Sequence, residues 1–204
     1  MRTRARLALL CALLGVASLG CPNSDSLLAA QATDAEGNPN RDASAAVLNN
    51  YANDLDDQGK HEEALRFYDA ALANYLPEQI TERASCHYNR GLALRRMGRW
   101  ADSVAAYETS WELDPGREIL SVNISIPLEE LGRHADAIVW LERGAKQFPE
   151  SLAIHETLAG IRVQHEEHEA ARAPAKKSLA LRKAGHDQND AKMIAYWTDY
   201  LATH

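Results

Sequence analysis

One helix–turn–helix pattern recurs along the chain, and it limits the fold more than any other feature of the sequence. Gly59, Gly98 and Gly132 each follow an amphipathic helical segment and precede a short turn and a second such segment. The second and third copies end at Pro115 and Pro149, and the step from Gly98 to Gly132 is 34 residues. A unit of two helices cannot bury its apolar faces alone, so we expect successive copies to stack against one another.

The register of the copies follows when the turn glycine is set at position fifteen of each unit. The sequence then divides into units 45–78, 84–117, 118–151 and 152–185. The fourth unit is placed by spacing alone, because Glu166 stands where the other units have glycine. The unit length, the helix–turn–helix content and the closing proline resemble the tetratricopeptide repeat. The resemblance implies an all-α fold, a right-handed superhelix of about four helix–turn–helix repeats.

Small residues agree with this register. The tetratricopeptide family has small side chains at positions eight, twenty and twenty-seven, where helices approach closely. Those positions here hold Ala52, Gly91, Ser125 and Ala159, then Ala64, Ser103, Ala137 and Ala171, and finally Ala71, Ser110, Gly144 and Ser178. The fourth unit follows the same rule as the others although only spacing placed it. We therefore expect a repeat domain over residues 43–186.

Residues 187–204 are expected to form a capping helix after the repeats. Ala191, Ile194, Trp197 and Leu201 fall on one face of such a helix. The last repeat of a stack exposes an apolar surface, which a helix with one polar side can cover.

The first helix of each unit is expected to carry a binding surface. In the tetratricopeptide family these helices line a concave groove, in which positions two, five, nine, twelve and thirteen face a ligand and asparagine is common at position six. Carried over to this sequence, the candidate groove residues are Asn49, Asn53, Tyr88, Asn89, Leu92, Arg95, Arg96, Ile119, Asn123, Ile126 and Glu130. Asparagine amides can hydrogen-bond a peptide backbone of any sequence, and apolar side chains add affinity. The expected ligand is a segment of another protein, although an ordinary solvated face is the alternative for Arg95, Arg96, Glu129 and Glu130.

Residues 1–20 have the pattern of a secretory signal peptide. Three arginines precede an apolar run of thirteen residues, shorter than the stretch of about twenty that spans a bilayer. Gly20 followed by Cys21 resembles the lipobox of bacterial lipoproteins, which implies lipidation of Cys21, and Pro22 then implies the outer membrane, facing the periplasm. Ordinary cleavage after Gly20 is the alternative and would release a soluble periplasmic or secreted protein. Residues 21–42, rich in Asn, Asp, Ser, Gly and Pro, are expected to be a flexible linker.

The charge of the chain limits its partners. The formal net charge is −7, and removal of residues 1–20 leaves −10 on the mature chain. Binding to nucleic acid needs clustered Lys and Arg that neutralise phosphates, and the sequence has no such basic stripe. The expected partners are another envelope protein or peptide segment, and the membrane through the lipid anchor, with no nucleic acid.

The segment RVQHEEHEAARAP, residues 162–174, raises the possibility of a metal site. A zinc protease of the H-E-x-x-H type has two histidine ligands four residues apart on one helix, with the glutamate as base. Here His165 and His168 are three apart, and Glu166 between them occupies the turn position. The segment is therefore interpreted as the charged turn of the fourth unit. No metal, cofactor or catalytic residue is expected, and a metal-dependent hydrolase is the weakest alternative.

Together these features predict a non-catalytic scaffold or adaptor of the bacterial cell envelope that binds a partner segment in its groove. A narrower alternative is a pilotin-like lipoprotein that assists outer-membrane assembly of a secretin, by analogy with tetratricopeptide lipoproteins of that role. A third alternative is a structural protein whose groove stays empty and whose other face packs in a larger complex.

Overall fold

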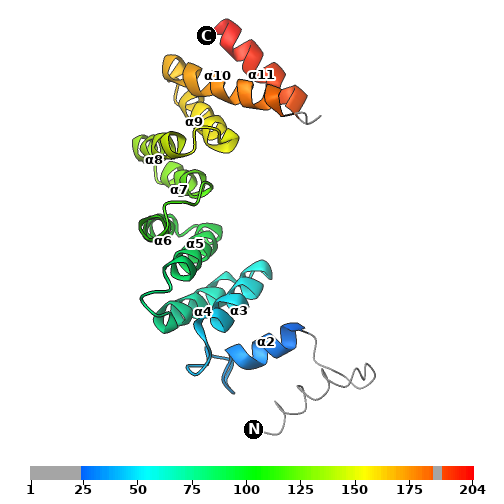
Figure 1. The fold of residues 1–204 in the computed structure, drawn as a ribbon, viewed down its shortest axis with the longest axis vertical. Helices are drawn as coiled ribbons and strands as arrows, with labels where there is room; N and C mark the ends of the chain where they lie inside the picture. Colours follow the sequence, from blue (N-terminus) through cyan, green and yellow to red (C-terminus); the bar gives the residue numbers. More distant parts are fainter. Residues whose placement is uncertain (1–23, 186–189) are drawn as a thin grey trace, which may run out of the picture. The chain divides into compact units, whose positions relative to one another are not determined.

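The structure is a computed structural model that describes residues 24–185 and 190–204. The expected signal peptide, residues 1–20, and the expected lipidation site, Cys21, lie outside these ranges. The described part is helical apart from turns and one isolated bridge between Thr33 and Pro39. Its helices, shown in Figure 1, are α2 (Ser24–Ala32), α3 (Ala45–Asp57), α4 (His61–Asn74), α5 (Ile80–Arg96), α6 (Trp100–Leu113), α7 (Leu120–Glu130), α8 (His134–Gln147), α9 (Leu152–Gln164), α10 (His168–Ala184) and α11 (Asp190–Thr203). None of these described helices combines the length and the apolar character that crossing a bilayer requires.

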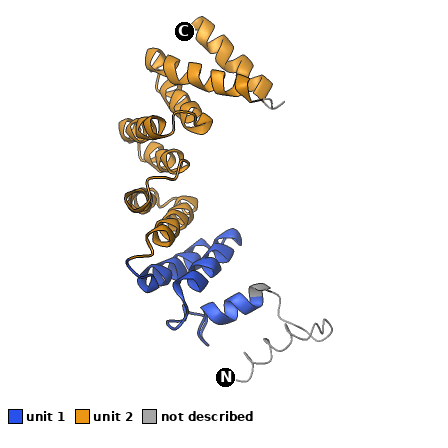
Figure 2. Cartoon of the chain, in the orientation of Figure 1, with its two compact units in different colours: residues 1–77 blue, residues 78–204 orange. Residues whose placement is uncertain are grey.

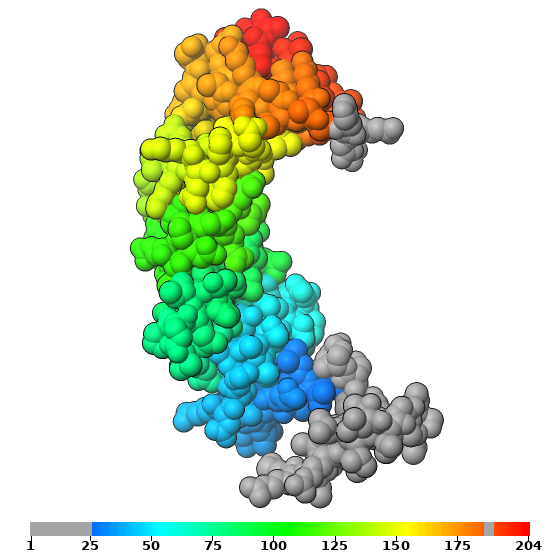
Figure 3. Space-filling view, in the orientation of Figure 1, coloured from blue at the N-terminus to red at the C-terminus, as the bar shows by residue number. Residues whose placement is uncertain are grey.

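Two compact units divide the chain, residues 1–77 and residues 78–204 (Figure 2). Unit 1 contains α2 to α4, and unit 2 contains α5 to α11. The helices pair in sequence order: α3 packs against α4, α5 against α6, α7 against α8 and α9 against α10. Within unit 2, α6 also packs against α7 and α8 against α9, so the pairs stack one after another, as the bands of colour from green to red in Figure 3 show.

Small side chains let the two helices of each pair approach closely. All twelve residues at positions eight, twenty and twenty-seven are buried. In the second repeat two of them also bond across the pair, because the hydroxyl of Ser103 donates to the carbonyl of Gly91 and that of Ser110 to the carbonyl of Ala84, both at 2.8 Å. A buried hydroxyl without a partner would cost about 1–3 kcal/mol, so these bonds offset the burial of Ser103 and Ser110.

The repeats of unit 2 share one apolar core. Its buried members, from α6 to α9, are Val104, Tyr107, Trp111, Leu120, Ile124, Leu128, Ala137, Leu141, Ile154, Leu158 and Ile161. Full burial of a large apolar side chain stabilises the fold by about 1.5–3 kcal/mol. Because this core runs through three consecutive helix pairs, each pair depends on its neighbour for part of its stability.

Each repeat turns at a residue in the left-handed region after its first helix. The turn glycines Gly59, Gly98 and Gly132 have φ of 78°, 71° and 70°. The next N–H then bonds back to the helix, as Arg133 does to the carbonyl of Leu128 at 2.8 Å, in the manner of a Schellman cap. The fourth repeat keeps this turn without glycine: Glu166 has φ 60°, and Glu167 bonds to Arg162 at 2.8 Å. A residue with a Cβ is strained in this conformation, whereas glycine is not.

The segment before the first repeat differs from the flexible linker expected from its composition. The chain forms α2, which packs against α3 and fully buries Ala32. A turn follows, in which the carboxylate of Asp34 accepts hydrogen bonds from the N–H groups of Glu36 and Asn38 at 3.0 and 2.8 Å. The polar residues that suggested a free chain therefore close a turn, a role to which Asp and Asn are equally suited.

Helix α11 packs against the last repeat. Its Trp197 and Tyr200 are buried together with Ala159, Ala171 and Ala175 of α9 and α10. The buried face is rotated from the expected one, because Tyr200 belongs to it and Ala191 is exposed. The apolar end of the fourth repeat is thereby covered, as a stack of repeats requires.

Hydrogen bonds that involve charged side chains connect α11 with α9 and α10. The Nε of Arg182 on α10 donates to Glu156 of α9 at 2.6 Å, and its Nη1 bonds to Asp190 of α11. The indole N–H of Trp197 donates to the same Glu156 carboxylate at 3.4 Å. The hydrogen bond to Glu156 is the main cause that raises the pKa of the Arg182 guanidinium above its ordinary value.

Candidate functional site

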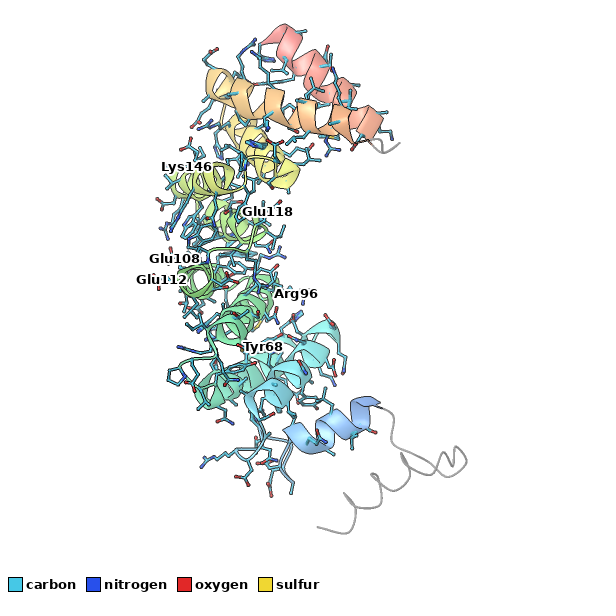
Figure 4. All side chains as sticks on the ribbon, viewed as in Figure 1. Tyr68, Arg96, Glu108, Glu112, Glu118 and Lys146 are labelled. Atoms are coloured by element: carbon cyan, nitrogen blue, oxygen red, sulfur yellow. The ribbon has the colours of Figure 1, made fainter. Side chains whose placement is uncertain are left out.

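Unit 2 presents the predicted groove residues of the second and third repeats on α5 and on α7 with its N-cap. We call this surface the α5–α7 face, and it consists of Tyr88, Asn89, Leu92, Arg95, Arg96, Ile119, Asn123, Ile126 and Glu130. Figure 4 shows Arg96 of α5 on one side of unit 2, and Glu112 of α6 and Lys146 of α8 on the other. The first and second helices of these repeats therefore offer two separate surfaces.

Two predicted residues from neighbouring repeats bond directly on the α5–α7 face. The side-chain N–H of Asn123 donates to the phenol oxygen of Tyr88 at 2.7 Å. Arg117 stacks over the Tyr88 ring, 4.8 Å from its centroid, and donates to the hydroxyl of Ser85 at 2.7 Å. An amide has two N–H donors and a carbonyl acceptor, so Asn123 keeps its oxygen and one N–H for a further partner.

Apolar side chains lie beside these polar groups. Leu92 and Val122 are half-buried against the core of unit 2, and Ile126 is half-buried as well. Ile119, the N-cap of α7, is 43% exposed. The face therefore keeps apolar surface that a bound partner would remove from water, at about 25 cal/mol for each Å².

The Arg95 side chain is half-buried near Tyr107 of α6. Its Nε is enclosed and makes no hydrogen bond within the described residues. Burial raises the pKa of Tyr107 to about 12, and the positive charge of Arg95 opposes that rise. The Nε itself is closed to solvent, so a ligand on this face could reach only the partly exposed remainder of the Arg95 side chain.

Glu129, next to Glu130 on α7, does not pair with the arginines of α5. One of its carboxylate oxygens lies 3.0 Å from Nδ1 of His134 and the other lies 2.8 Å from Nε2 of His165. Arg96 and Glu130 are exposed. The carboxylate of Glu129 is therefore engaged by two histidines, not by a cation of α5.

His165 and His168, adjacent in the sequence pattern, do not form a site together. His168 lies with Nδ1 3.1 Å from the hydroxyl of Tyr200, and its ring stacks on that of His204 at 4.4 Å. His165, the C-cap of α9, instead contacts Glu129 beside the turn of the third repeat. The left-handed residue Glu166 reverses the chain between the two histidines, which is why they diverge.

The group formed by Glu129, His134 and His165 was not expected from the sequence. Among the described residues it is the one set of three His, Cys, Asp or Glu whose potential ligand atoms all lie within 4.8 Å of one another. A partial signal was available, since His134 follows Glu129 by five residues just as His61 follows Asp56 in the first repeat. There, too, the side chains meet, with Nδ1 of His61 2.6 Å from Asp56.

Unit 1 carries the other two predicted groove residues, both on α3. The side-chain oxygen of Asn53 accepts a hydrogen bond from the hydroxyl of Tyr68 on α4 at 2.8 Å, so Asn53 contributes to the packing of the helix pair. The side-chain oxygen of Asn49 is buried and makes no hydrogen bond within the described residues. The side-chain oxygen of Asn49 is therefore still without a donor among the described residues, whereas the side-chain oxygen of Asn53 is bonded to Tyr68.

Comparison with known proteins identifies the type of repeat. A family model described as tetratricopeptide repeat matches residues 44–73. No curated protein matches the sequence. Among solved structures, MamA from Desulfovibrio magneticus RS-1 (residue 41 to the end) is similar with a TM-score of 0.60 at 19% identity, over 78% of this chain and 88% of that chain.

Two further solved structures give the same result. The structure named MamA MSR-1 C2 has a TM-score of 0.63 at 17% identity, over 88% of this chain and 95% of that chain. YrrB, a TPR protein with an unusual peptide-binding site, has a TM-score of 0.55 at 15% identity, over 79% of this chain and 88% of that chain. At these identities the likeness is one of fold. The predicted fold class, all-α with tetratricopeptide helix–turn–helix repeats, is confirmed.

Proposed function

We propose that the protein is a non-catalytic scaffold that binds a segment of another protein on the α5–α7 face. The observation that carries the proposal is that unused hydrogen-bonding groups lie beside exposed apolar surface on two adjacent repeats. The hydrogen-bonding groups are the remaining amide N–H and oxygen of Asn123 and the half-buried guanidinium of Arg95, and the apolar surface is the exposed side chain of Ile119.

A peptide is the ligand that this chemistry suits best. A peptide backbone supplies carbonyl acceptors for Arg95 and for the free N–H of Asn123, and N–H donors for the Asn123 oxygen. An apolar side chain of the peptide would cover Ile119, and exposed Arg96 and Glu130 would select among charged residues at the rim. The peptide-binding site of YrrB, which has a similar fold, supports this class of ligand.

Co-purification from native cells tests the proposal when two matched variants are compared with the wild type. Ile119→Asp places a charge on the α5–α7 face at a side chain that is 43% exposed. Val139→Asp places the same charge on α8, where Val139 is 61% exposed. We expect one protein to be recovered with the wild type and with Val139→Asp and to be lost with Ile119→Asp. Recovery that depends on Val139 alone, or on neither residue, would contradict the proposed surface.

We further propose that the scaffold acts in the bacterial envelope as a lipoprotein anchored through Cys21. The support is the sequence pattern of residues 1–20 and the lipobox-like Gly20-Cys21. Labelling of cells with a fatty acid analogue should mark the wild type, and Cys21→Ser should remove the label and release the protein from the membrane fraction. Equal labelling of both proteins would rule out this anchor.

The pilotin-like role is the narrower form of the same proposal. It requires that the partner lost with Ile119→Asp be a secretin. Deletion of the scaffold should then leave that secretin in the inner membrane, whereas normal assembly in the outer membrane would exclude this role and leave the general one.

A further inference from the structure

Glu129, His134 and His165 bring three metal-ligating atoms to one point of unit 2. The two oxygens of Glu129 lie 3.0 Å from Nδ1 of His134 and 2.8 Å from Nε2 of His165. The two imidazole rings lie 3.7 Å apart, centre to centre, at an angle of 42°. A zinc ion with bonds of about 2.0–2.1 Å in tetrahedral geometry holds neighbouring ligand atoms about 3.4 Å apart. The potential ligand atoms of the three side chains all lie within 4.8 Å of one another, so some of them would need to draw together by up to about 1.4 Å to receive such an ion.

The backbone of two different repeats fixes the positions of these ligands. Glu129 lies at the end of α7 and His134 at the start of α8, on either side of the tight turn at Gly132. His165 is the C-cap of α9 and directly precedes the left-handed Glu166. The side chains of Glu129 and His165 are only 17% and 24% exposed. The side chain of His134 is more open, at 42% exposed, so an ion could reach the group from solvent.

Comparison among the repeats separates this group from an ordinary contact within a turn. His61 and Asp56 of the first repeat repeat the pairing of His134 with Glu129, with the same five-residue spacing and a distance of 2.6 Å. A histidine–carboxylate pair therefore spans the turn in two of the four repeats. The third repeat differs because His165, from the fourth repeat, also contacts its glutamate. Position fourteen holds Gln58, Met97, Leu131 and His165 in the four units, so histidine stands there only in the unit that follows Glu129.

The chemistry of the three ligands selects the kind of ion. Two imidazole nitrogens and one carboxylate form the ligand set of zinc sites that keep one position open, and they disfavour Mg²⁺ and Ca²⁺, which take oxygen ligands. We propose that Glu129, His134 and His165 bind one divalent transition-metal ion of the zinc type, joining the third repeat to the fourth.

The surroundings leave room for the remaining coordination position. A shallow cavity of about 430 Å³ opens beside the group and is lined by both histidines, Asp136 and Glu167 among others. Arg133, a cation that also lines it, is bonded through Nε to Asp136 at 2.6 Å, so its charge is offset. Water or a side chain from a partner could therefore occupy the fourth position. In the sequence, His165 was considered as a metal ligand only together with His168, so this group with Glu129 and His134 was not expected.

Isothermal titration of ZnCl₂ into the full chain, freed of metal with a chelator, tests this site. We expect one zinc ion per chain. His134→Ala and His165→Ala should each weaken the affinity at least about tenfold, because each removes one of three protein ligands. Glu129→Gln should do the same while keeping the size of the side chain and a hydrogen-bonding oxygen.

Two matched controls guard against binding to histidines in general. His61→Ala removes the equivalent histidine of the first repeat, and His168→Ala removes the neighbour of His165 that bonds to Tyr200. Both should bind zinc as the wild type does. MgCl₂ in place of ZnCl₂ should give no heat of binding at the same concentrations.

A second readout keeps the test valid for variants that are less stable. Co²⁺ in place of zinc should give the visible absorption of a four-coordinate site in the wild type and in His61→Ala, and lose it in Glu129→Gln, whose folding is checked by circular dichroism. The proposal is overturned if the wild type binds no zinc, or if zinc and cobalt bind to His165→Ala and Glu129→Gln as to the wild type. Neither result bears on peptide binding, which the Ile119→Asp comparison tests separately.

Discussion

At the scale of the residue, two glycines inside helices have opposite surroundings. A Cβ on Gly144 of α8 would lie 2.4 Å from Oγ and 2.6 Å from Cβ of Ser121 on α7, whereas a Cβ on Gly160 of α9 would meet nothing within 4 Å. We expect Gly144→Ala to lower the free energy of unfolding by about 1–3 kcal/mol, because α7 and α8 must move apart. Gly160→Ala should raise it by about 0.5–1 kcal/mol through helix propensity. Urea unfolding of both variants measures the difference, and a stabilised Gly144→Ala would contradict this packing.

The turn of the fourth repeat contains a strained residue that can be relieved. Glu166 is exposed and has φ 60°, where its Cβ is crowded. We expect Glu166→Gly to raise the free energy of unfolding by about 0.5–1 kcal/mol. The change removes the steric strain of the Cβ, and this gain is partly offset because glycine loses more conformational entropy on folding. Gly132→Ala, the reverse change at the same repeat position, should lower it by about 1 kcal/mol. Thermal melts that move in the same direction for both variants would show that the left-handed turn is not the cause.

Tyr107 makes the stability depend on pH in the alkaline range. Burial raises its pKa to about 12, above the value of about 10 in an unfolded chain. The neutral phenol's contribution is therefore intact below pH 10 and is lost as the pH rises through 12. Between these values the wild type should lose about 2–3 kcal/mol relative to Tyr107→Phe. Urea unfolding at several pH values measures this loss, and Tyr196→Phe, at an exposed ring, is the control that should behave as the wild type does.

At the scale of the element, the charged bonds around Arg182 decide how firmly α11 is held. Arg182→Met keeps most of the side-chain volume but leaves Glu156 and Asp190 without their shared cation. We expect the amides of α11 to exchange with solvent faster, with a local loss of about 1–3 kcal/mol. Arg133→Met is the control, because its pair with Asp136 is half exposed and should contribute at most about 0.5 kcal/mol. Hydrogen exchange that is unchanged in Arg182→Met would mean that Trp197 and Tyr200 hold α11 alone.

The sequence predicts the helices and turns of the repeats well, because the apolar periodicity, the turn glycines and the small residues all depend on structure within one helix pair. Helix α2 was missed because its sequence has little periodicity of its own, and its order comes from packing against α3. Its polar turn residues are those of a linker as well, so composition did not distinguish the two.

The candidate sites were harder to predict than the elements. The register correctly placed Tyr88 and Asn123 on neighbouring first helices, but their mutual hydrogen bond depends on the angle between repeats, which the sequence does not encode locally. The same is true of His165, whose distance from Glu129 is set by the left-handed turn and by the stacking of α9 on α8. Spacing in the sequence predicts which residues of one helix lie side by side, but it does not predict which residues of different repeats come into contact.

At the scale of the whole molecule, the central claim is that the first helices of unit 2, not the second helices, form the working surface. The two surfaces differ in chemistry. The α5–α7 face has amides and the half-buried guanidinium of Arg95, whereas Glu112 of α6 and Lys146 of α8 are exposed charged groups on the other side (Figure 4). A partner that bound equally well to both surfaces would not depend on the amides and the guanidinium that only the α5–α7 face offers.

The most direct measurement is photo-crosslinking in native cells, with a photoreactive amino acid placed at one position at a time. Ile119 and Arg96 report on the α5–α7 face, and Val139 and Glu112 report on the second helices. We predict that the probes at Ile119 and Arg96 attach to one common protein, identified by mass spectrometry, and that the probes at Val139 and Glu112 do not. Attachment from Val139 and Glu112 only, or equally from all four positions, would contradict the account.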